Sequence, residues 1–423
     1  MNQYIFVFLL STLFLFNGCL LPFKKEFEPE MITSMNIIDR NGMSETISSK
    51  DRLSTFDKTN FLTPQPYQKV LRVYGRKKNG NIHSYLTSYH PNGQPKQYLE
   101  AINNRAYGSY QEWFPNGQMK IDAKVIGGIA DLDTSAEQSW LFEGLNRVWN
   151  EEGILIAQIP YNKGELEGEV IYYHDNSLVW KITPYDKGFL QGTQKIYLDN
   201  GRLFQTIDYN HGEKEGEAIR YWNNGEQAYH EQYKKDLLME GDYLNPCGSK
   251  ISEIRKGEGW RAVFGKESLQ ELQEFQNGIQ EGAIHVFDEE EKLIRIYHLE
   301  NGLKQGEEVD YFPNTNQTKL LLTWHCGVLQ GPVKTWYENG QNESQREMSG
   351  NRKNGLLTAW YRNGNLMLVE EYSNDKLIKG EYYRLGENIP LSKVEKGHGT
   401  ATLFNPEGIF LNKIDYQDGI PVN

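Results

Sequence analysis

Two glycine-containing segments have the residue types of nucleotide-binding loops. Gly257-Glu-Gly259-Trp-Arg-Ala262 fits a loose dinucleotide-binding pattern of three small residues. That pattern requires a preceding strand and a following helix, whereas the surrounding sequence predicts a turn and a short strand. The segment from Gly259 to Gly265-Lys266-Glu267 is similar to a phosphate loop, but its spacing is one residue too long. Glu267 also replaces the Ser or Thr that would bind Mg²⁺, so no cofactor is expected.

Other reactive side chains do not form a catalytic or metal-binding pattern. His325-Cys326 is the only adjacent His–Cys pair, and neither His-Glu-x-x-His nor Cys-x-x-Cys occurs. A metal site would therefore need ligands from several strands, and none is expected. The Gly-x-Ser-x-Gly motif of serine hydrolases is also absent. The many carboxylates are interpreted as solvated surface charge, and the chain is predicted not to be an enzyme.

The apolar N-terminus predicts export. Residues 4–16 are almost wholly apolar, which is too short for a membrane-spanning helix of ~20 residues but typical of a secretory signal. Asn17, Gly18 and Cys19 follow, and the segment resembles a bacterial lipoprotein signal. The resemblance implies a signal peptide over 1–18, lipidation of Cys19, and a lipid-anchored protein of the bacterial cell envelope. It departs from that pattern because residues 1–3 contain no Lys or Arg, so ordinary cleavage, an uncleaved anchor and a cytoplasmic chain stay as alternatives.

Residues 19–66 are predicted to form a flexible tether. They have weak periodicity, many polar residues and prolines at 22, 29, 64 and 66. One short strand or helix is expected over Met35–Arg40. The tether would hold the following domain away from the membrane.

Composition favours short strands and many turns. The chain has 423 residues, among them 40 Gly, 26 Tyr, 18 Phe and 9 Trp, while hydrophobic residues reach only 38%. Abundant glycine and aromatic residues with few aliphatic ones are typical of β-hairpins. The net charge of −12 argues against nucleic-acid binding and against attraction to anionic lipid.

A repeat of about 24 residues begins near Tyr67. Gly168, Gly192 and Gly216 follow one another at intervals of 24 residues, and the spacing continues through the later repeats. We call these the aligned glycines. Eleven of 13 have an aromatic residue five positions later, the exceptions being Gly241 and Gly380. These repeat aromatics are expected to be structural: Trp113, Trp149, Tyr173, Tyr197, Tyr221, Phe264, Phe287, Tyr311, Trp336, Trp360 and Phe404.

Two kinds of turn separate the predicted strands. Asn-Gly recurs, as in Asn224-Gly225, and predicts a type I′ hairpin in which both central residues have positive φ. A second, looser turn reads Tyr161-Asn-Lys-Gly164 and Phe275-Gln-Asn-Gly278. Each repeat is therefore predicted to be a strand, an Asn-Gly turn, a second strand and the looser turn.

The repeats resemble the bacterial variant of MORN repeats, as found in YwqK-type antitoxins. Gly216-Glu-Ala-Ile-Arg-Tyr221-Trp-Asn-Asn-Gly225 and Gly331-Pro-Val-Lys-Thr-Trp336-Tyr-Glu-Asn-Gly340 carry the similarity. The predicted fold is an all-β, elongated antiparallel β-hairpin array, a single-layer ribbon or solenoid over 67–420. Irregular patches are expected near 121–143 and 245–275. Cys247 and Cys326 would lie about three repeats apart, too far for a disulfide, so both are predicted to be free thiols.

These features predict a non-catalytic envelope lipoprotein whose array binds or scaffolds a protein partner of unknown identity. The resemblance implies an alternative, an antitoxin or immunity-type protein that neutralises a toxin by direct binding. Repeat aromatics are expected in the core, whereas aromatics just before the Asn-Gly turns are candidate partner-facing residues: Phe114, Trp222, Tyr337 and Tyr361. An exposed sheet edge would also permit homodimerisation.

Overall fold

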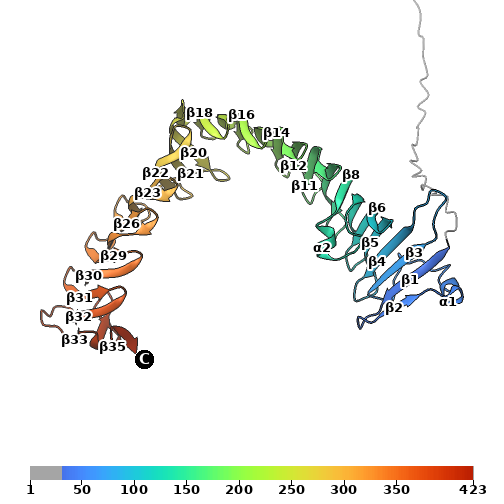
Figure 1. Ribbon diagram of the computed structural model, residues 1–423. Coiled ribbons are helices and arrows are strands. Elements are labelled where there is room, and N and C mark those ends of the chain that lie inside the picture. Colours follow the sequence, from blue (N-terminus) through green and yellow to red (C-terminus); the bar gives the residue numbers. More distant parts are fainter. Residues whose placement is uncertain (1–30, 423) are drawn as a thin grey trace, which may run out of the picture. The chain divides into compact units, whose positions relative to one another are not determined.

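The computed structural model describes residues 31–422, which form two compact regions (Figure 1). The described part of the N-terminal region comprises residues 31–117 and 127–140, and that of the C-terminal region residues 118–126 and 141–422. The predicted signal peptide and Cys19 lie outside the described residues. Residues 31–422 contain 36 strands, all paired antiparallel, and two short helices. The predicted all-β hairpin array is confirmed.

The N-terminal region begins with a small folded layer rather than with repeats. Its elements are β1 (Ile32–Ile38), β2 (Ser44–Ile47), α1 (Lys50–Ser54), β3 (Lys69–Tyr74), β4 (His83–Tyr89), β5 (Pro95–Ile102), β6 (Arg105–Trp113) and α2 (Thr134–Glu137). Strand β1 pairs with both β2 and β3.

The prediction of a flexible tether is wrong for residues 32–66. Met35, Leu53 and Phe61 are buried in one cluster with Val70 and Tyr89 of the strands that follow. Arg40 donates hydrogen bonds to the carbonyl oxygens of residues 65, 66 and 90. The apolar residues of this segment are few, but they alternate along β1 and therefore form a continuous core face.

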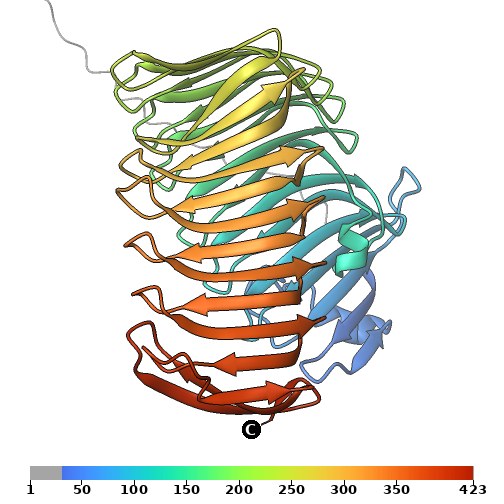
Figure 2. The ribbon, with the colours of Figure 1, turned by 90° about the vertical axis from the view of Figure 1, so that its left-hand side faces the viewer.

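The C-terminal region is a ladder of hairpins, and Figure 2 shows its later strands as successive rungs. Its strands are β7 (Met119–Gly127, whose last residue belongs to the N-terminal region), β8 (Leu141–Trp149), β9 (Leu155–Asn162), β10 (Glu165–Leu166), β11 (Gly168–Tyr173), β12 (Val179–Asp186), β13 (Phe189–Leu190), β14 (Gly192–Tyr197), β15 (Leu203–Asn210), β16 (Glu213–Tyr221), β17 (Gln227–Lys234), β18 (Leu237–Leu244), β19 (Lys250–Arg255), β20 (Glu258–Phe264), β21 (Leu269–Gln276), β22 (Ile279–Phe287), β23 (Leu293–Glu300), β24 (Leu303–Lys304), β25 (Gly306–Tyr311), β26 (Thr318–His325), β27 (Val328–Leu329), β28 (Gly331–Trp336), β29 (Asn342–Ser349), β30 (Arg352–Trp360), β31 (Leu366–Ser373), β32 (Lys376–Tyr382), β33 (Ser392–Glu395), β34 (His398–Phe404), β35 (Phe410–Gln417) and β36 (Ile420–Val422).

The Asn-Gly turns are not of type I′. In the turn after Tyr221, the amide of Gly225 bonds to the carbonyl of Trp222 at 2.9 Å, and Trp222 N bonds to Glu226 O at 2.8 Å. Gly225 has φ +91°, whereas Asn224 has no positive φ. This is a longer loop with one left-handed glycine and a register shift in the strands, a common hairpin connection. Asn224 instead donates through Nδ2 to the carbonyl of Pro246 in the next such turn, at 2.9 Å.

The looser turns are the two-residue turns with two left-handed residues. Lys163 and Gly164 have φ of +50° and +91°, and Asn277 and Gly278 have +53° and +80°. Two-residue loops with positive φ at both positions match the right-handed twist of the strands. The prediction therefore exchanged the two turn types, and we call these connections the short turns.

The aligned glycines leave space for side chains of the preceding strand. Gly216 has φ +107°, and a Cβ at this position would meet the side chain of Asp208. The carboxylate of Asp208 accepts a hydrogen bond from Glu217 N. The residue two positions after most aligned glycines is buried, as Val170 and Val333 show, although Arg261 and Leu357 are half-buried. This position defines the core face that the sequence pattern left open.

Gly241 and Gly380 differ from the other aligned glycines because each faces a tyrosine of its own strand. A Cβ at either position would lie 2.6 Å from the hydroxyl of Tyr243 or Tyr382, respectively. Both tyrosines are fully buried.

The two predicted irregular patches have different structures. Patch 121–143 contains the helix α2, whose N-terminus is capped by Asp133. Patch 245–275 contains the ordinary strands β19, β20 and β21, but here the repeats are shorter. The first residues of β18, β20 and β22, at 237, 258 and 279, are separated by 21 residues instead of 24.

Candidate functional site

The side chain of the residue directly before an aligned glycine can accept a hydrogen bond from the short turn of the next repeat. Gln191 accepts a hydrogen bond from the backbone N–H of His211 at 2.9 Å, and Glu167 accepts one from Lys187 N at 2.9 Å. The donors are the first left-handed residues of the short turns. Interpreting all carboxylates as solvated charge is therefore wrong, because Glu167 satisfies a turn amide that has no partner in its own hairpin.

The repeat aromatics lie in the hairpin layer with different degrees of burial. Phe264 and Phe404 are buried, and the other nine are half-buried. The rings therefore do not form one continuous buried stack.

Three of the four candidate partner-facing aromatics are buried, so their prediction is wrong. Trp222, Tyr337 and Tyr361 are 4%, 5% and 0% exposed, and Phe114 is half-buried. Trp222 Nε1 donates to Leu244 O at 3.0 Å. The hydroxyl groups of Tyr337 and Tyr361 likewise donate to backbone carbonyls 23 and 22 residues later. In these three Asn-Gly turns, the N–H or O–H group of the aromatic side chain donates a hydrogen bond to a backbone carbonyl of the next repeat.

The shortened repeats contain a buried carboxylate cluster, and we call residues 220–279 around it the first short module. Glu231 is 1% exposed. It accepts hydrogen bonds from the hydroxyl groups of Tyr233 at 2.9 Å and Tyr243 at 2.8 Å, and from Arg261 Nε at 2.7 Å. Burial raises the pKa of both tyrosines.

A second short module (residues 359–420) repeats this arrangement. Glu370 accepts hydrogen bonds from Tyr372 at 3.0 Å and Tyr382 at 2.8 Å. Gly397 corresponds to Gly257, since a Cβ at either would lie about 2.5 Å from the backbone nitrogen of a short-turn glycine. Ala401 occupies the position of Arg261, so the second carboxylate has no equivalent guanidinium.

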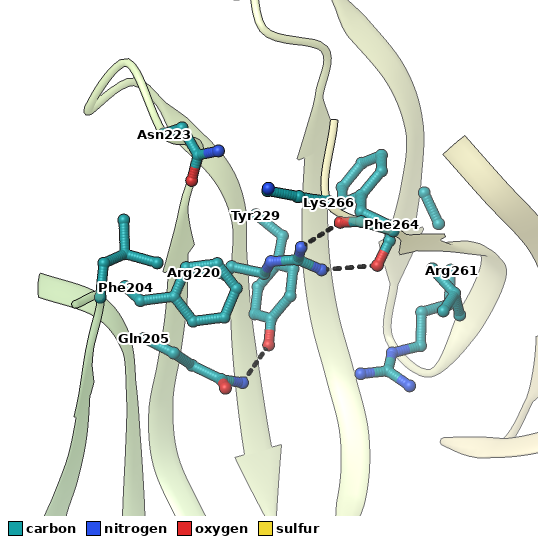
Figure 3. A pocket seen from close by; sticks show the side chains of 12 residues that line it. Phe204, Gln205, Arg220, Asn223, Tyr229, Arg261, Phe264 and Lys266 are labelled. Atoms are coloured by element: carbon teal, nitrogen blue, oxygen red, sulfur yellow. Dashed lines mark hydrogen bonds between the residues drawn. The ribbon is translucent and has the colours of Figure 1, made fainter. Parts of the chain in front are cut away.

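A cavity of about 440 Å³ lies beside the first short module. Its walls come from β15, β16, β17 and β20 and from the turns after β14, β16 and β20 (Figure 3). The lining residues are Leu198, Phe204, Gln205, Arg220, Asn223, Tyr229, Arg261, Ala262, Val263, Phe264, Gly265 and Lys266. The cavity therefore combines aromatic and aliphatic walls with three basic side chains.

Arg220 fixes the geometry of this cavity. Its guanidinium donates to the carbonyl of Phe264 at 2.8 Å and to that of Gly265, as Figure 3 shows. It also lies 4.8 Å from the centre of the Phe204 ring. These bonds join β16 to a turn more than 40 residues later, and burial lowers the pKa of Arg220.

Tyr229 forms another wall of the cavity. It is 6% exposed, and its hydroxyl accepts a hydrogen bond from Gln205 Nε2 at 2.6 Å. Burial raises its pKa to about 12. The phenol therefore stays neutral at physiological pH and contributes a polar atom to a largely apolar wall.

The sequence reasoning missed this cavity. In the sequence, Gly265 and Lys266 are similar only to part of a phosphate loop, but in the structure they line the cavity as the turn after β20. Gly259, the second residue of β20, has a φ of +134°. The signal that could have located the site is the 21-residue spacing, because a shortened repeat changes how neighbouring hairpins pack.

A second exposed feature follows the short turns. Leu237, Ile279 and Leu303 are 39%, 52% and 50% exposed, and each is the first residue after a short turn. A Cβ at Gly278 would contact Leu237, and one at Gly327 would contact Leu303, so each of these two leucines lies over a later short turn. We call Leu237, Ile279, Leu303 and the half-buried Val328 the apolar ridge.

The cysteine and histidine residues form no shared site in residues 31–422. Cys247 and Cys326 are both free and exposed. His325 lies next to Cys326, and no group of three potential metal ligands was found in this range. Both helices of the described chain are too short to cross a bilayer.

The comparisons with known proteins give only distant structural similarity. No family model and no curated protein matches the chain. A solved structure titled TcdB2-TccC3-TEV is 12% identical, with a TM-score of 0.15; the match covers 90% of this chain but 24% of that one. A porin-like protein from Bacteroides uniformis is 9% identical with a TM-score of 0.16, over 57% of this chain and 94% of that one.

Proposed function

We propose that this protein is a non-catalytic binding protein whose hairpin array presents a surface to a protein partner. The apolar ridge is the observation that carries the proposal. Three aliphatic side chains that are about 40–50% exposed each follow a short turn of the same ladder, and exposed apolar surface marks interaction sites. The similarity of the repeats to bacterial MORN-type repeats agrees with a binding role.

We further propose that the protein is exported and anchored through a lipid on Cys19. The apolar run and Cys19 support this localisation. Metabolic labelling with a fatty-acid probe tests it. Wild type should be labelled and should fractionate with membranes, whereas Cys19→Ala should lose both properties. Unchanged fractionation of Cys19→Ala would overturn the anchor.

The ridge is tested by charge substitution. Ile279→Asp with Leu303→Asp should reduce recovery of the partner at least tenfold in cross-linking and purification from cells. Arg352→Asp is the matched control, because Arg352 also begins a strand after a short turn but lies outside the ridge. Equal recovery with all three proteins would contradict a role of the ridge.

The identity of the recovered partner separates two functions. Several envelope proteins would support a scaffold. A single small protein whose toxicity is suppressed by this chain would support the antitoxin alternative that the repeat resemblance implies.

A further inference from the structure

The cavity beside the first short module has an unbalanced charge. Arg220, Arg261 and Lys266 line it, and none of the 12 lining residues is acidic. Glu231 forms an ion pair with Arg261 at 2.7 Å, which leaves Arg220 and Lys266 without a carboxylate on the cavity wall. This local excess of positive charge occurs in a chain whose net charge is −12.

Arg220 is oriented before any ligand arrives. Two backbone carbonyls hold its terminal nitrogens, while its Nε is buried and has no hydrogen-bond partner. The rings of Phe204 and Trp222 lie 4.8 and 5.8 Å from its guanidinium carbon. A partly desolvated cation is unfavourable unless an anion compensates its charge.

The second short module forms the same glutamate–tyrosine cluster without these basic residues. It retains the buried glutamate, the two tyrosines and the glycines of the first module. However, Ala359, Ala401 and Pro406 stand where the first module has Arg220, Arg261 and Lys266. The basic cluster is therefore present at only one of the two corresponding positions.

We propose that this cavity binds a carboxylate attached to an aromatic or aliphatic group. A carboxylate would balance the positive charge of Arg220 and Lys266 on the cavity wall, and Phe204, Val263 and Phe264 provide an apolar wall for the rest of the ligand. The volume of about 440 Å³ is in the range of small-ligand pockets. The ligand is either a free organic acid or the C-terminal residue of a polypeptide. This site is separate from the apolar ridge and does not depend on it.

Calorimetric titration of the purified full chain tests the site. N-acetylphenylalanine should bind, and N-acetylphenylalaninamide should bind at least tenfold more weakly because it lacks the carboxylate. Equal binding of acid and amide, or tighter binding of inorganic phosphate than of the acid, would overturn the proposal. The tripeptide Ala-Ala-Phe with a free C-terminus distinguishes the sources: binding supports a polypeptide terminus, and binding of the acetylated amino acid alone supports a free acid.

Variants locate the binding. Arg220→Ala should weaken binding of N-acetylphenylalanine at least tenfold, and Arg220→Lys should give an intermediate loss. Ala359 at the equivalent position of the second module indicates that alanine is compatible with the fold, which circular dichroism would verify. Lys234→Ala, an exposed site with the same change in charge, should bind as wild type does. Unchanged binding by Arg220→Ala would exclude this cavity.

Discussion

At the scale of single residues, buried carboxylates organise both short modules. Glu231 and Glu370 each accept two tyrosine hydroxyl groups. A buried charge is stable only when hydrogen bonds or an opposite charge replace its hydration. The two sites differ in one partner, since Arg261 faces only the first, and this difference can be measured.

Glu231→Gln should lower the free energy of unfolding by about 3 kcal/mol, because it leaves a buried ion pair without its anion. Glu370→Gln should cost less, since no guanidinium loses its partner. Urea unfolding followed by tryptophan fluorescence measures both effects. Glu217→Gln is the control, as Glu217 is 54% exposed and should change stability by less than ~0.5 kcal/mol. Equal losses at Glu231 and Glu217 would contradict the assigned role.

Alkaline pH should destabilise the first short module. Burial raises the pKa of Tyr229 from 10.0 to about 12. A raised folded-state pKa contributes stability that is complete below pH 10 and is lost as pH rises toward 12. Between pH 9 and 11, Tyr229→Phe should therefore lose about 1 kcal/mol less stability than wild type. Urea unfolding at both pH values checks this, and identical losses would refute it.

At the scale of elements, the sequence predicted strands well and turns poorly. Periodic glycine and aromatic residues indicated the hairpins because their spacing follows strand length. The Asn-Gly dipeptide predicted the wrong turn type, because its Asn donates a hydrogen bond to the corresponding turn of the next repeat instead of adopting a positive φ. Burial of Trp222 and the cavity around Arg220 depend on hairpins that are far apart in sequence, so local patterns could not reveal them.

The short-turn glycines should differ in their tolerance of alanine. Gly257 has φ +80°, and its Cβ would lie 2.5 Å from the backbone nitrogen of Gly278. Gly212 has φ +90°, with nothing within 4 Å. Gly212→Ala should cost about 1–2 kcal/mol from left-handed strain alone. Gly257→Ala should cost at least about 3 kcal/mol, and urea unfolding that ranks the variants in reverse would disprove the packing argument.

At the scale of the whole molecule, regular repeats depend mainly on their neighbours. Their hydrogen bonds join strands adjacent in sequence, and side chains such as Gln191 bond to turns only 20 residues later. Stability of such arrays is close to a sum of repeat and interface contributions. A repeat should therefore be removable if the turns on either side remain equivalent.

Deletion of residues 165–188 should leave a folded protein. It places Phe189, the first residue after one short turn, directly after Gly164 of the preceding short turn. Circular dichroism should retain the β signal, with cooperative urea unfolding. Deletion of residues 165–176, about half a repeat, should abolish folding. The strand that follows the deletion would then run in the wrong direction and turn its core side chains away from the core. Equal behaviour of the two deletions would contradict modular stacking.

The contrast between regular repeats and short modules also has an evolutionary consequence. Unequal recombination between regular repeats exchanges one interface for an equivalent one, so the number of such repeats can change without creating a new packing problem. The short modules cannot be exchanged in this way, because Gly257 and Gly397 each fit closely against one specific short turn. Related chains should therefore vary in length within the regular repeats and keep the two short modules intact.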